Sequence, residues 1–255
     1  MTDSIIRARG ILNRFGPQLV HDDLDLEVQR GEILGIVGGS GTGKSVLLRT
    51  LIGLRRPQAG RVEILGRDLW SLSDIERQRL EQRWGVLFQE GALFTSLSVL
   101  QNIEVPMREF LDLPEPLIAE VAALKLALVG LPPDAGAKFP DELSGGMRKR
   151  TGLARALALD PEIVFLDEPT AGLDPVGAAA FDELVAELNR ALGITVVMVT
   201  HDLDTLHAVC HRIAVLAERR VMVVGTMQTM LEHPHPWIRE YFHGPRGRAA
   251  LAARG

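Results

Sequence analysis

The sequence has little of what export or insertion into a membrane requires. Its single cysteine, Cys210, cannot form an internal disulfide, and this fits a reducing compartment. Wholly apolar runs are short, as at residues 196–199, whereas a membrane helix needs about 18 or more such residues. Charged residues such as Asp3 and Arg7 interrupt the N-terminal segment, so the apolar core of a signal peptide is missing there. We therefore expect no export signal, and membrane association only through a partner protein.

Charge of one sign is not in excess either. The 28 Lys and Arg residues face 33 Asp and Glu residues, which gives a net charge of -5 and a pI near 5.8. Such a chain has no global positive field to hold DNA or RNA, so we expect no nucleic-acid partner. The 255 residues, 46% hydrophobic and 24% charged, are typical of a globular chain that buries a sizeable core.

Short β-branched segments alternate with helical segments in two blocks of the chain. This alternation is typical of an α/β fold with a mostly parallel sheet. The predicted strands are residues 32–37, 61–65, 84–88, 162–167 and 194–200, and the predicted helices start at Lys44, span 73–83 and 175–192, and follow Asp202.

The segment between the two blocks differs from both. Residues 96–159 have almost no strand signal and are predicted to be helical, with apolar positions at helical spacing over 116–131. Residues 212–225, after the second block, are typical of a hairpin that turns near 218–220. We therefore predict an α/β domain that carries a helical insertion.

A glycine-rich segment, GGSGTGKS at residues 38–45, matches the spacing G-x-x-x-x-G-K-[ST] and lies between a predicted strand and a predicted helix. Its glycines allow the backbone N–H groups to face a polyphosphate, and Lys44 can reach the β- and γ-phosphates. The hydroxyl of Ser45 can ligate Mg²⁺. The motif predicts binding of a nucleoside triphosphate.

Two carboxylates end the apolar run EIVFLDE at residues 162–168. This pattern is typical of a buried parallel strand whose C-terminal end opens onto a ligand site. Asp167 is placed to hold Mg²⁺ through its waters, and Glu168 can polarise an attacking water as a general base. Alone, the pattern also fits a plain strand with an acidic turn, but the phosphate-binding motif in the same chain favours the catalytic interpretation.

The segment ELSGGMRKR at residues 142–150 predicts the start of a helix capped by Ser144. Its glycines leave backbone N–H groups open to a second anion, and that anion could belong to a nucleotide held by another copy of the chain. Taken in isolation, the segment fits better a plain capped helix on which Arg148, Lys149 and Arg150 form a solvated basic face.

Together these segments resemble the ABC transporter ATPases. The resemblance rests on the order and spacing of GGSGTGKS, Gln89, LSGG at 143–146, FLDEP at 165–169, AGLD at 171–174 and His201, and covers roughly residues 4–232. It implies a P-loop NTPase with the ABC ATPase fold: a mostly parallel core sheet, an antiparallel β region and a helical subdomain. The implied division of the single domain 1–255 is a core at 1–95 and 160–232, a helical subdomain at 96–159 and a tail at 233–255.

The resemblance also implies a role for each site residue in ATP hydrolysis with Mg²⁺. Phe15 would stack on adenine, Gln89 would contact Mg²⁺ and water, and His201 would contact the γ-phosphate. The implied catalytic residues are Glu168, His201, Lys44 and Gln89, and the implied metal ligands are Ser45, Gln89 and Asp167. The other implied ATP-binding residues are Gly38, Gly39, Ser40, Gly41, Thr42, Gly43 and Val46, and those that act on the second subunit of a homodimer are Ser144, Gly145, Gly146 and Asp174.

Residues 86–110 and the signature LSGGM narrow the resemblance to the MlaF/Mkl group, the ATPases of MCE-type (Mla) phospholipid transport systems. Met147 stands where the commoner signature has glutamine, so a side chain that could hydrogen-bond across the dimer is lost. The implied partners are an integral membrane permease (MlaE-like), an MCE-domain protein (MlaD-like) and a small accessory subunit (MlaB-like). The implied location is cytoplasmic, on the inner face of the inner membrane through the permease.

Two alternatives stay open at this point. The chain could serve another ABC importer or exporter, or it could be an ABC ATPase that works without a permease. Its single ATPase unit and the lack of a long coiled-coil interruption argue against most proteins of the second kind. The lipid-transport interpretation predicts that an apolar patch docks the permease, and we expect this patch to comprise Leu93, Phe94, Leu97 and Leu100.

Overall fold

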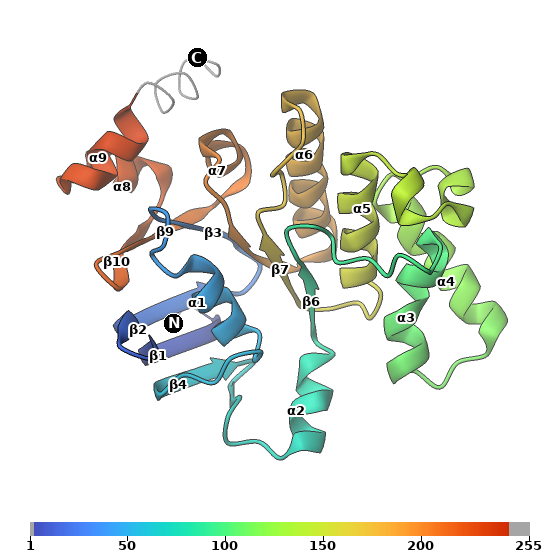
Figure 1. Ribbon diagram of the computed structural model, residues 1–255, viewed down its shortest axis with the longest axis horizontal. Helices are drawn as coiled ribbons and strands as arrows, with labels where there is room; N and C mark the ends of the chain where they lie inside the picture. Colours follow the sequence, from blue (N-terminus) through green and yellow to red (C-terminus); the bar gives the residue numbers. More distant parts are fainter. Residues whose placement is uncertain (1–2, 245–255) are drawn as a thin grey trace. The chain divides into compact units, whose positions relative to one another are not determined.

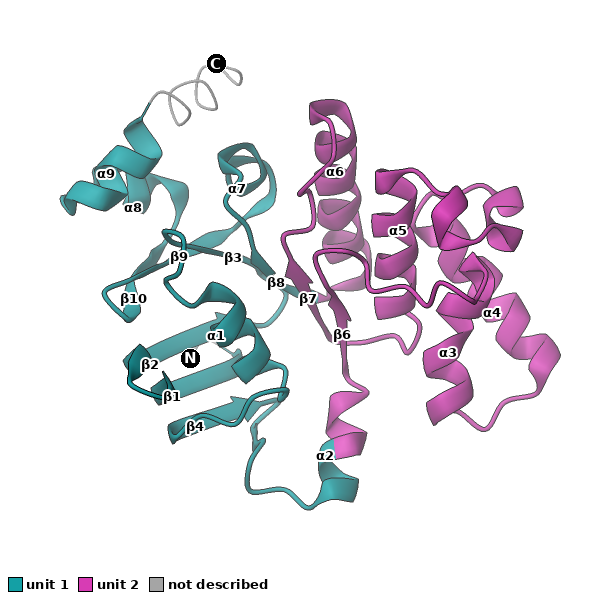
Figure 2. Ribbon diagram, viewed as in Figure 1, with its two compact units in different colours: residues 1–77, 195–255 teal, residues 78–194 magenta. Residues whose placement is uncertain are grey.

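The computed structural model describes residues 3–244, which form two compact units (Figure 2). The described part of unit 1 comprises residues 3–77 and 195–244, and unit 2 comprises residues 78–194. The last part of the predicted tail, residues 245–255, lies outside the described residues. The predicted helical subdomain, 96–159, is contained in unit 2, and its boundaries stay a prediction.

Unit 1 begins with an antiparallel sheet that the sequence analysis identified only in part. Alternating residues of its second strand, Leu24, Leu26 and Val28, are buried, while the residues between them are not. This alternation is the normal result of packing one face of a sheet on a core. The strand order is β2-β1-β4-β5, with β1 at Ser4–Phe15, β2 at Gln18–Gln29, β4 at Ala59–Ile64 and β5 at Arg67–Asp68. Figure 1 labels the first three of these strands, which lie side by side in this order.

A second group of strands in unit 1 is mostly parallel, as predicted. The central strand β3 (Ile33–Val37) is buried along its whole length and pairs in parallel with β8 (Thr195–Val199) and β9 (Arg212–Ala217). Strand β10 (Arg220–Gly225) pairs antiparallel with β9. The predicted hairpin over 212–225 is therefore confirmed, and its turn lies at Glu218 and Arg219, which both have positive φ.

Helices and a compact apolar cluster complete unit 1. The cluster includes Val37, Leu206, Ile213, Met230 and Phe242, so the last helices share a core with the central strand. Burial of such side chains, at roughly 25 cal/mol per Å², is what holds these short helices in place. The helices are α1 (Lys44–Leu51), α7 (Leu203–Val209), α8 (Met227–Glu232) and α9 (Pro236–His243), and α2 (Asp74–Glu81) leads into unit 2.

Unit 2 combines a pair of parallel strands with helices. Strands β6 (Trp84–Leu87) and β7 (Ile163–Asp167) pair in parallel, and Gly85 lies so close to Ala156 O that an added Cβ would be 1.9 Å from that oxygen. The helices are α3 (Val99–Phe110), α4 (Glu115–Leu128), α5 (Gly145–Ala156) and α6 (Pro175–Leu192), with 3-10 turns at Pro133–Ala137 and Pro140–Glu142. The predicted helical character of 96–159 is confirmed.

The structure thus contains a parallel β region, an antiparallel β region and a helical segment, as the predicted fold class requires. Within residues 3–244, every helix is too short or too polar to span a bilayer.

Candidate functional site

The phosphate loop, residues 38–45, connects β3 to α1 in unit 1 as predicted. Its glycines are required by geometry. A Cβ on Gly38 would lie 2.3 Å from Leu216 O, and Gly43 has φ +97, with room for a Cβ blocked by Val20 and His21 at 2.5 and 2.6 Å. The left-handed region and these close approaches exclude larger residues. The loop is therefore pressed against two neighbouring strands.

Lys44 starts helix α1 and folds back over the loop. Its Nζ donates hydrogen bonds to Gly38 O at 2.8 Å and Gly39 O at 3.1 Å. Ser45 is exposed in the first turn of the same helix. An ammonium, a hydroxyl and the N–H groups of a helix start thus gather at one place, which is the chemistry that binds phosphate oxygens.

A buried polar network lies behind the phosphate loop, and the sequence analysis missed it. Asn13 Nδ2 donates to His21 Nδ1 at 3.1 Å and to Thr50 Oγ1 at 3.0 Å, while Asn13 Oδ1 accepts from Arg55 Nε at 3.2 Å. Burial lowers the pKa of His21 to about 4, so the imidazole is neutral near pH 7. The neutral form also suits Nδ1 as an acceptor. In the sequence, His21 precedes two aspartates and gives no sign of burial.

Phe15, the predicted adenine contact, ends strand β1 and is 43% exposed. The Arg55 guanidinium stacks 3.7 Å from the centroid of its ring and donates to Arg14 O at 2.9 Å. A cation held over an aromatic face fixes the ring and leaves part of its surface open.

His201 follows β8 in unit 1 and is exposed, and the C-terminal helix α9 contacts its backbone. Tyr241 donates a hydrogen bond from its hydroxyl to His201 O at 3.0 Å. Trp237 stacks on Tyr241 with the ring centroids 4.9 Å apart, and its Nε1 lies 3.9 Å from the place that a Cβ on Gly39 would occupy. Helix α9 therefore touches both the His201 segment and the phosphate loop, a connection that the sequence analysis missed.

The two predicted carboxylates end strand β7 in unit 2. Asp167 is the last residue of the strand, and Glu168 directly after it has φ +48, in the left-handed region that non-glycine residues seldom adopt. Such conformations store strain and concentrate at functional sites. Here the strained residue is Glu168, the position predicted to carry the general base.

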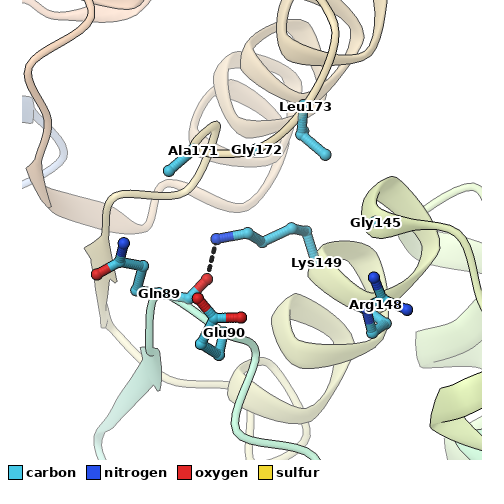
Figure 3. A pocket seen from close by; sticks show the side chains of 8 residues that line it. All are labelled: Gln89, Glu90, Gly145, Arg148, Lys149, Ala171, Gly172 and Leu173. Atoms are coloured by element: carbon cyan, nitrogen blue, oxygen red, sulfur yellow. Dashed lines mark hydrogen bonds between the residues drawn. The ribbon is translucent and has the colours of Figure 1, made fainter.

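Gln89 and Glu90 follow strand β6 and line a pocket of about 280 Å³ in unit 2 (Figure 3). Lys149 of helix α5 reaches across this pocket, where its Nζ donates to Gln89 O and, at 3.0 Å, to Glu168 O. Lys149 is only 6% exposed. The solvated basic face that fitted residues 148–150 in isolation is therefore wrong for Lys149, because backbone carbonyls draw its side chain inward.

The predicted cap of helix α5 is confirmed, since Ser144 Oγ accepts from Met147 N at 3.2 Å. Gly145 and Gly146 begin the helix. The loop residues 171–173 lie beside Gly145, since a Cβ added to Gly145 would be 3.6 Å from Leu173 Cδ2. Asp174, predicted at a dimer interface, caps helix α6 and accepts from Gly177 N at 2.9 Å.

The predicted site residues are thus distributed over both units. Unit 1 holds Phe15, the phosphate loop with Val46, and His201, while unit 2 holds Gln89, Asp167, Glu168, the segment 144–146 and Asp174. Within each unit the structure gives their surroundings, and their roles with a nucleotide stay predictions.

The predicted docking patch is only partly open. Phe94 is 50% exposed, while Leu93, Leu97 and Leu100 are partly covered. The buried Asn102 holds this segment, because its side chain accepts from Phe94 N at 2.8 Å and donates to Leu97 O at 3.0 Å. A neighbouring groove of about 270 Å³ in unit 2 is lined by residues that include Trp84, Phe88, Pro106, Phe110 and Arg155.

Comparison with known proteins gives the following relatives. A sequence model of the family described as ABC transporter matches residues 21–171. The chain is 40% identical over 241 residues to "Probable ribonucleotide transport ATP-binding protein mkl" of Mycobacterium tuberculosis, covering 94% of this chain and 67% of that protein. It is 36% identical over 244 residues to "Intermembrane phospholipid transport system ATP-binding protein MlaF" of Haemophilus influenzae, covering 96% of this chain and 92% of that protein.

Solved structures are also similar. A dimeric ATP-binding cassette in a post-hydrolysis state, bound to ADP and Pi, superposes with a TM-score of 0.79 at 28% identity and covers 87% of this chain and 98% of that chain. The structure of cbiO1 from Clostridium perfringens, part of an ABC transporter complex, has a TM-score of 0.81 at 28% identity and covers 99% and 100%. The predicted fold class and the resemblance to MlaF and Mkl are confirmed.

Proposed function

Since the chain belongs to the ABC transporter family and is an ABC-type ATPase, we propose that it powers phospholipid transport between membranes together with an MCE-domain partner. The observation that carries the proposal is the match to two MlaF proteins, at 36% identity over 92% and 89% of their lengths. Ribonucleotide transport is the second candidate, favoured by the 40% identity to proteins with that name. Those proteins match over only 67–69% of their length, so we favour the first.

In the proposed site, unit 1 binds the nucleotide. The N–H groups of the phosphate loop and the Lys44 ammonium neutralise the charge of the β- and γ-phosphates, and the open surface of Phe15 stacks on the adenine. His201 contacts the γ-phosphate. The residues proposed to contact ATP are Phe15, Gly38, Gly39, Ser40, Gly41, Thr42, Gly43, Lys44, Ser45 and Val46.

The residues proposed to hold Mg²⁺ are Ser45, Gln89 and Asp167. They fit this ion by the chemistry of their donors, because a hydroxyl, an amide oxygen and a carboxylate are the hard oxygen ligands that Mg²⁺ prefers. Bound there, the ion would neutralise charge that develops on the phosphate oxygens. Ser45 is exposed, and Asp167 lies half-buried at the end of β7.

Glu168 is proposed as the general base. Its carboxylate accepts a proton from a water whose oxygen attacks the γ-phosphorus, so that the bond to the β-γ bridging oxygen breaks and ADP and phosphate form. Gln89 helps to orient that water. Lys44 and His201 stabilise the negative charge on the transferred group.

A homodimer is proposed to complete each site. Ser144, Gly145 and Gly146 present the N-terminus of the twelve-residue helix α5, which suits the γ-phosphate of a nucleotide held by a second copy. Asp174 lies on the adjoining loop and is proposed to face the same interface. The dimeric, ADP-bound relative supports this arrangement.

The proposed partners are an MlaE-like permease, an MlaD-like MCE protein and an MlaB-like accessory subunit, with the chain held on the cytoplasmic face of the inner membrane. We propose that a cytoplasmic helix of the permease docks at Phe94 and the adjoining groove of unit 2. Arg155 lines the groove and donates to Gly91 O at 2.9 Å and Ala92 O at 2.8 Å. The side chain of Arg155 therefore connects a partner bound in the groove to the segment that follows Gln89.

Purification of the tagged chain from detergent-solubilised membranes tests the transport assignment. We expect a permease and an MCE-domain protein to copurify with the parent, and Phe94→Asp to lose both while it still binds ATP, because a buried unpaired charge costs several kcal/mol. Leu124→Asp is the matched control, since Leu124 is an exposed apolar residue of the same unit, 68% exposed, on helix α4. Recovery of a soluble complex without any membrane protein would contradict the assignment.

The cargo needs its own assay. Proteoliposomes that contain the recovered complex should transfer a fluorescent phospholipid in an ATP-dependent manner. ATP-dependent uptake of a labelled ribonucleotide with no lipid transfer would favour the second candidate.

A further inference from the structure

The pocket in unit 2 contains a buried cation that none of the proposed roles uses (Figure 3). Lys149 projects from helix α5 into the space between the Gln89 segment and the loop 171–173, and 94% of its surface is covered. Burial lowers the pKa of Lys149, whereas the carboxylates of Glu90, Glu168 and Asp167 oppose this effect and favour the ammonium form. Removing an ammonium group from water costs free energy, and hydrogen bonds to the buried group must offset that cost.

Those contacts are backbone carbonyls on two different loops. The ammonium donates to Gln89 O and to Glu168 O, so one side chain links the residue after β6 to the residue after β7. Glu168 has φ +48, in the left-handed region that non-glycine residues seldom adopt. A charge-assisted hydrogen bond to its carbonyl oxygen stabilises this turn and thereby fixes where the carboxylate begins.

Helix α5 holds the Gln loop, residues 89–92, at further points. Arg155 binds Gly91 O and Ala92 O, and Ala92 also has positive φ, +47. Gly152 packs on the same loop, since its Cβ would lie 3.3 Å from Gly91 O. Helix α5 therefore holds the carbonyls of Gln89, Gly91 and Ala92, and a shift of that helix against the loop strains the contacts of Lys149.

We propose that Lys149 is a positioning residue for ATP hydrolysis, which joins the Gln loop to the backbone of Glu168 and keeps Glu168 in its turn. The inference rests on the proposed role of Glu168 as general base. Two events then act on one ammonium. Displacement of the Gln loop by a docked partner moves Gln89 O, and engagement of Ser144 at the start of α5 moves the helix that carries Lys149.

Replacement of Lys149 tests this link through the split between kcat and KM. Lys149→Met keeps the length of the side chain and removes every donor. We expect kcat for ATP to fall about tenfold while KM for ATP changes less than about twofold, because the phosphate loop and Phe15 are untouched. Lys149→Gln restores an N–H donor and should recover part of the loss.

Lys125→Met is the matched control. Lys125 is also a buried lysine of unit 2, 8% exposed, and it pairs with Asp160 outside the proposed site. If both methionine variants lose kcat to the same degree, the loss comes from removing any buried lysine and the inference is overturned. Retention of the parent kcat in Lys149→Met overturns it as well.

A double-mutant cycle with Glu168→Gln separates this inference from the proposed function. Because both changes act on the same step, Lys149→Met should slow the Glu168→Gln variant by less than about twofold. A full further tenfold loss contradicts the link to Glu168. If Glu168→Gln turns over ATP at the parent rate, Glu168 is not the base and the proposed function is wrong. If Glu168→Gln is inactive but Lys149→Met is fully active, only the inference about Lys149 is wrong.

Discussion

His21 in unit 1 and Lys149 in unit 2 are both buried basic side chains next to a functional loop, and burial lowers the pKa of both. Their surroundings differ. His21 accepts from the Asn13 amide and lies near the Arg55 cation, and its pKa falls to about 4. Burial of Lys149 is the larger effect on its pKa, but three nearby carboxylates oppose it, and the side chain donates to two carbonyl oxygens.

The two buried bases differ in charge and in the groups that they hold. Behind the phosphate loop the buried base itself, His21, is neutral near pH 7, and Lys44 and the backbone N–H groups supply positive potential to the loop. In the pocket of unit 2 the support is itself a cation, and it holds acceptor groups of the loops that carry Gln89 and Glu168. A buried base thus serves as a packing element in one unit and as a tie between two loops in the other.

The largest effect should come from a methyl group added between the phosphate loop and His21. Gly43→Ala places a Cβ 2.6 Å from His21 Nε2 at φ +97, so we expect ATP affinity to fall by on the order of a thousandfold. Gly41→Ala is the control, since Gly41 has φ +77 but no atom within 4 Å of its Cβ. Titration calorimetry with MgATP measures both, and equal losses would contradict the support by His21.

The neutral state of His21 predicts a pH effect on stability. Above pH 6.5 the imidazole is neutral in the folded and unfolded chains, whereas between pH 6.5 and about 4 it binds a proton only in the unfolded chain. The free energy of unfolding should therefore fall with decreasing pH, by up to about 3 kcal/mol in total. Urea unfolding of the parent and of His21→Gln measures this contribution as a difference, and parallel pH profiles would show that His21 is not held neutral.

A negative charge at the start of α5 should affect unit 2 without weakening unit 1. Gly145→Asp places a carboxylate where the γ-phosphate of another copy is proposed to bind, and like charges repel. We expect the MgATP-dependent dimer fraction of the Glu168→Gln background to drop at least about tenfold, with ATP affinity of the monomer unchanged. Analytical ultracentrifugation measures the dimer fraction, and an unchanged value would contradict the proposal that a second copy completes each site.

The smallest effect should come from the contact between helix α9 and His201. Tyr241→Phe removes the hydroxyl that donates to His201 O at 3.0 Å, and one exposed hydrogen bond contributes about 1 kcal/mol. We expect turnover to decrease about two- to threefold with the ring stack on Trp237 retained. Near-UV circular dichroism reports the stack, and a loss of turnover well beyond threefold with the stack retained would contradict this small contribution.

Much of the fold follows from local pattern in the sequence. Continuous apolar runs predict β3, β7 and β8 to within a residue or two, and Pro175 and Gly193 mark both ends of α6. The antiparallel strands β1 and β2 were missed although Leu24, Leu26 and Val28 alternate with polar residues, because charged residues such as Arg7 and Arg9 interrupt the apolar pattern of β1.

The candidate site divides in the same way. Motif spacing predicts the phosphate loop, Glu168 and the cap Ser144, because each of these depends on residues close together in the chain. The burial of Lys149 and the network of Asn13, His21, Thr50 and Arg55 depend on segments that meet only after folding. A basic residue beside two others in sequence gives no sign that a carbonyl on a distant loop will draw it inward.

The decisive measurement is the turnover of Glu168→Gln at saturating MgATP, beside that of Lys44→Ala. We propose that unit 1 binds the nucleotide and that Glu168 in unit 2 accepts the proton. Glu168→Gln should therefore bind ATP within about twofold of the parent and lose on the order of a hundredfold or more in turnover, whereas Lys44→Ala should lose affinity itself. Hydrolysis by Glu168→Gln at the parent rate would contradict the proposed role of Glu168.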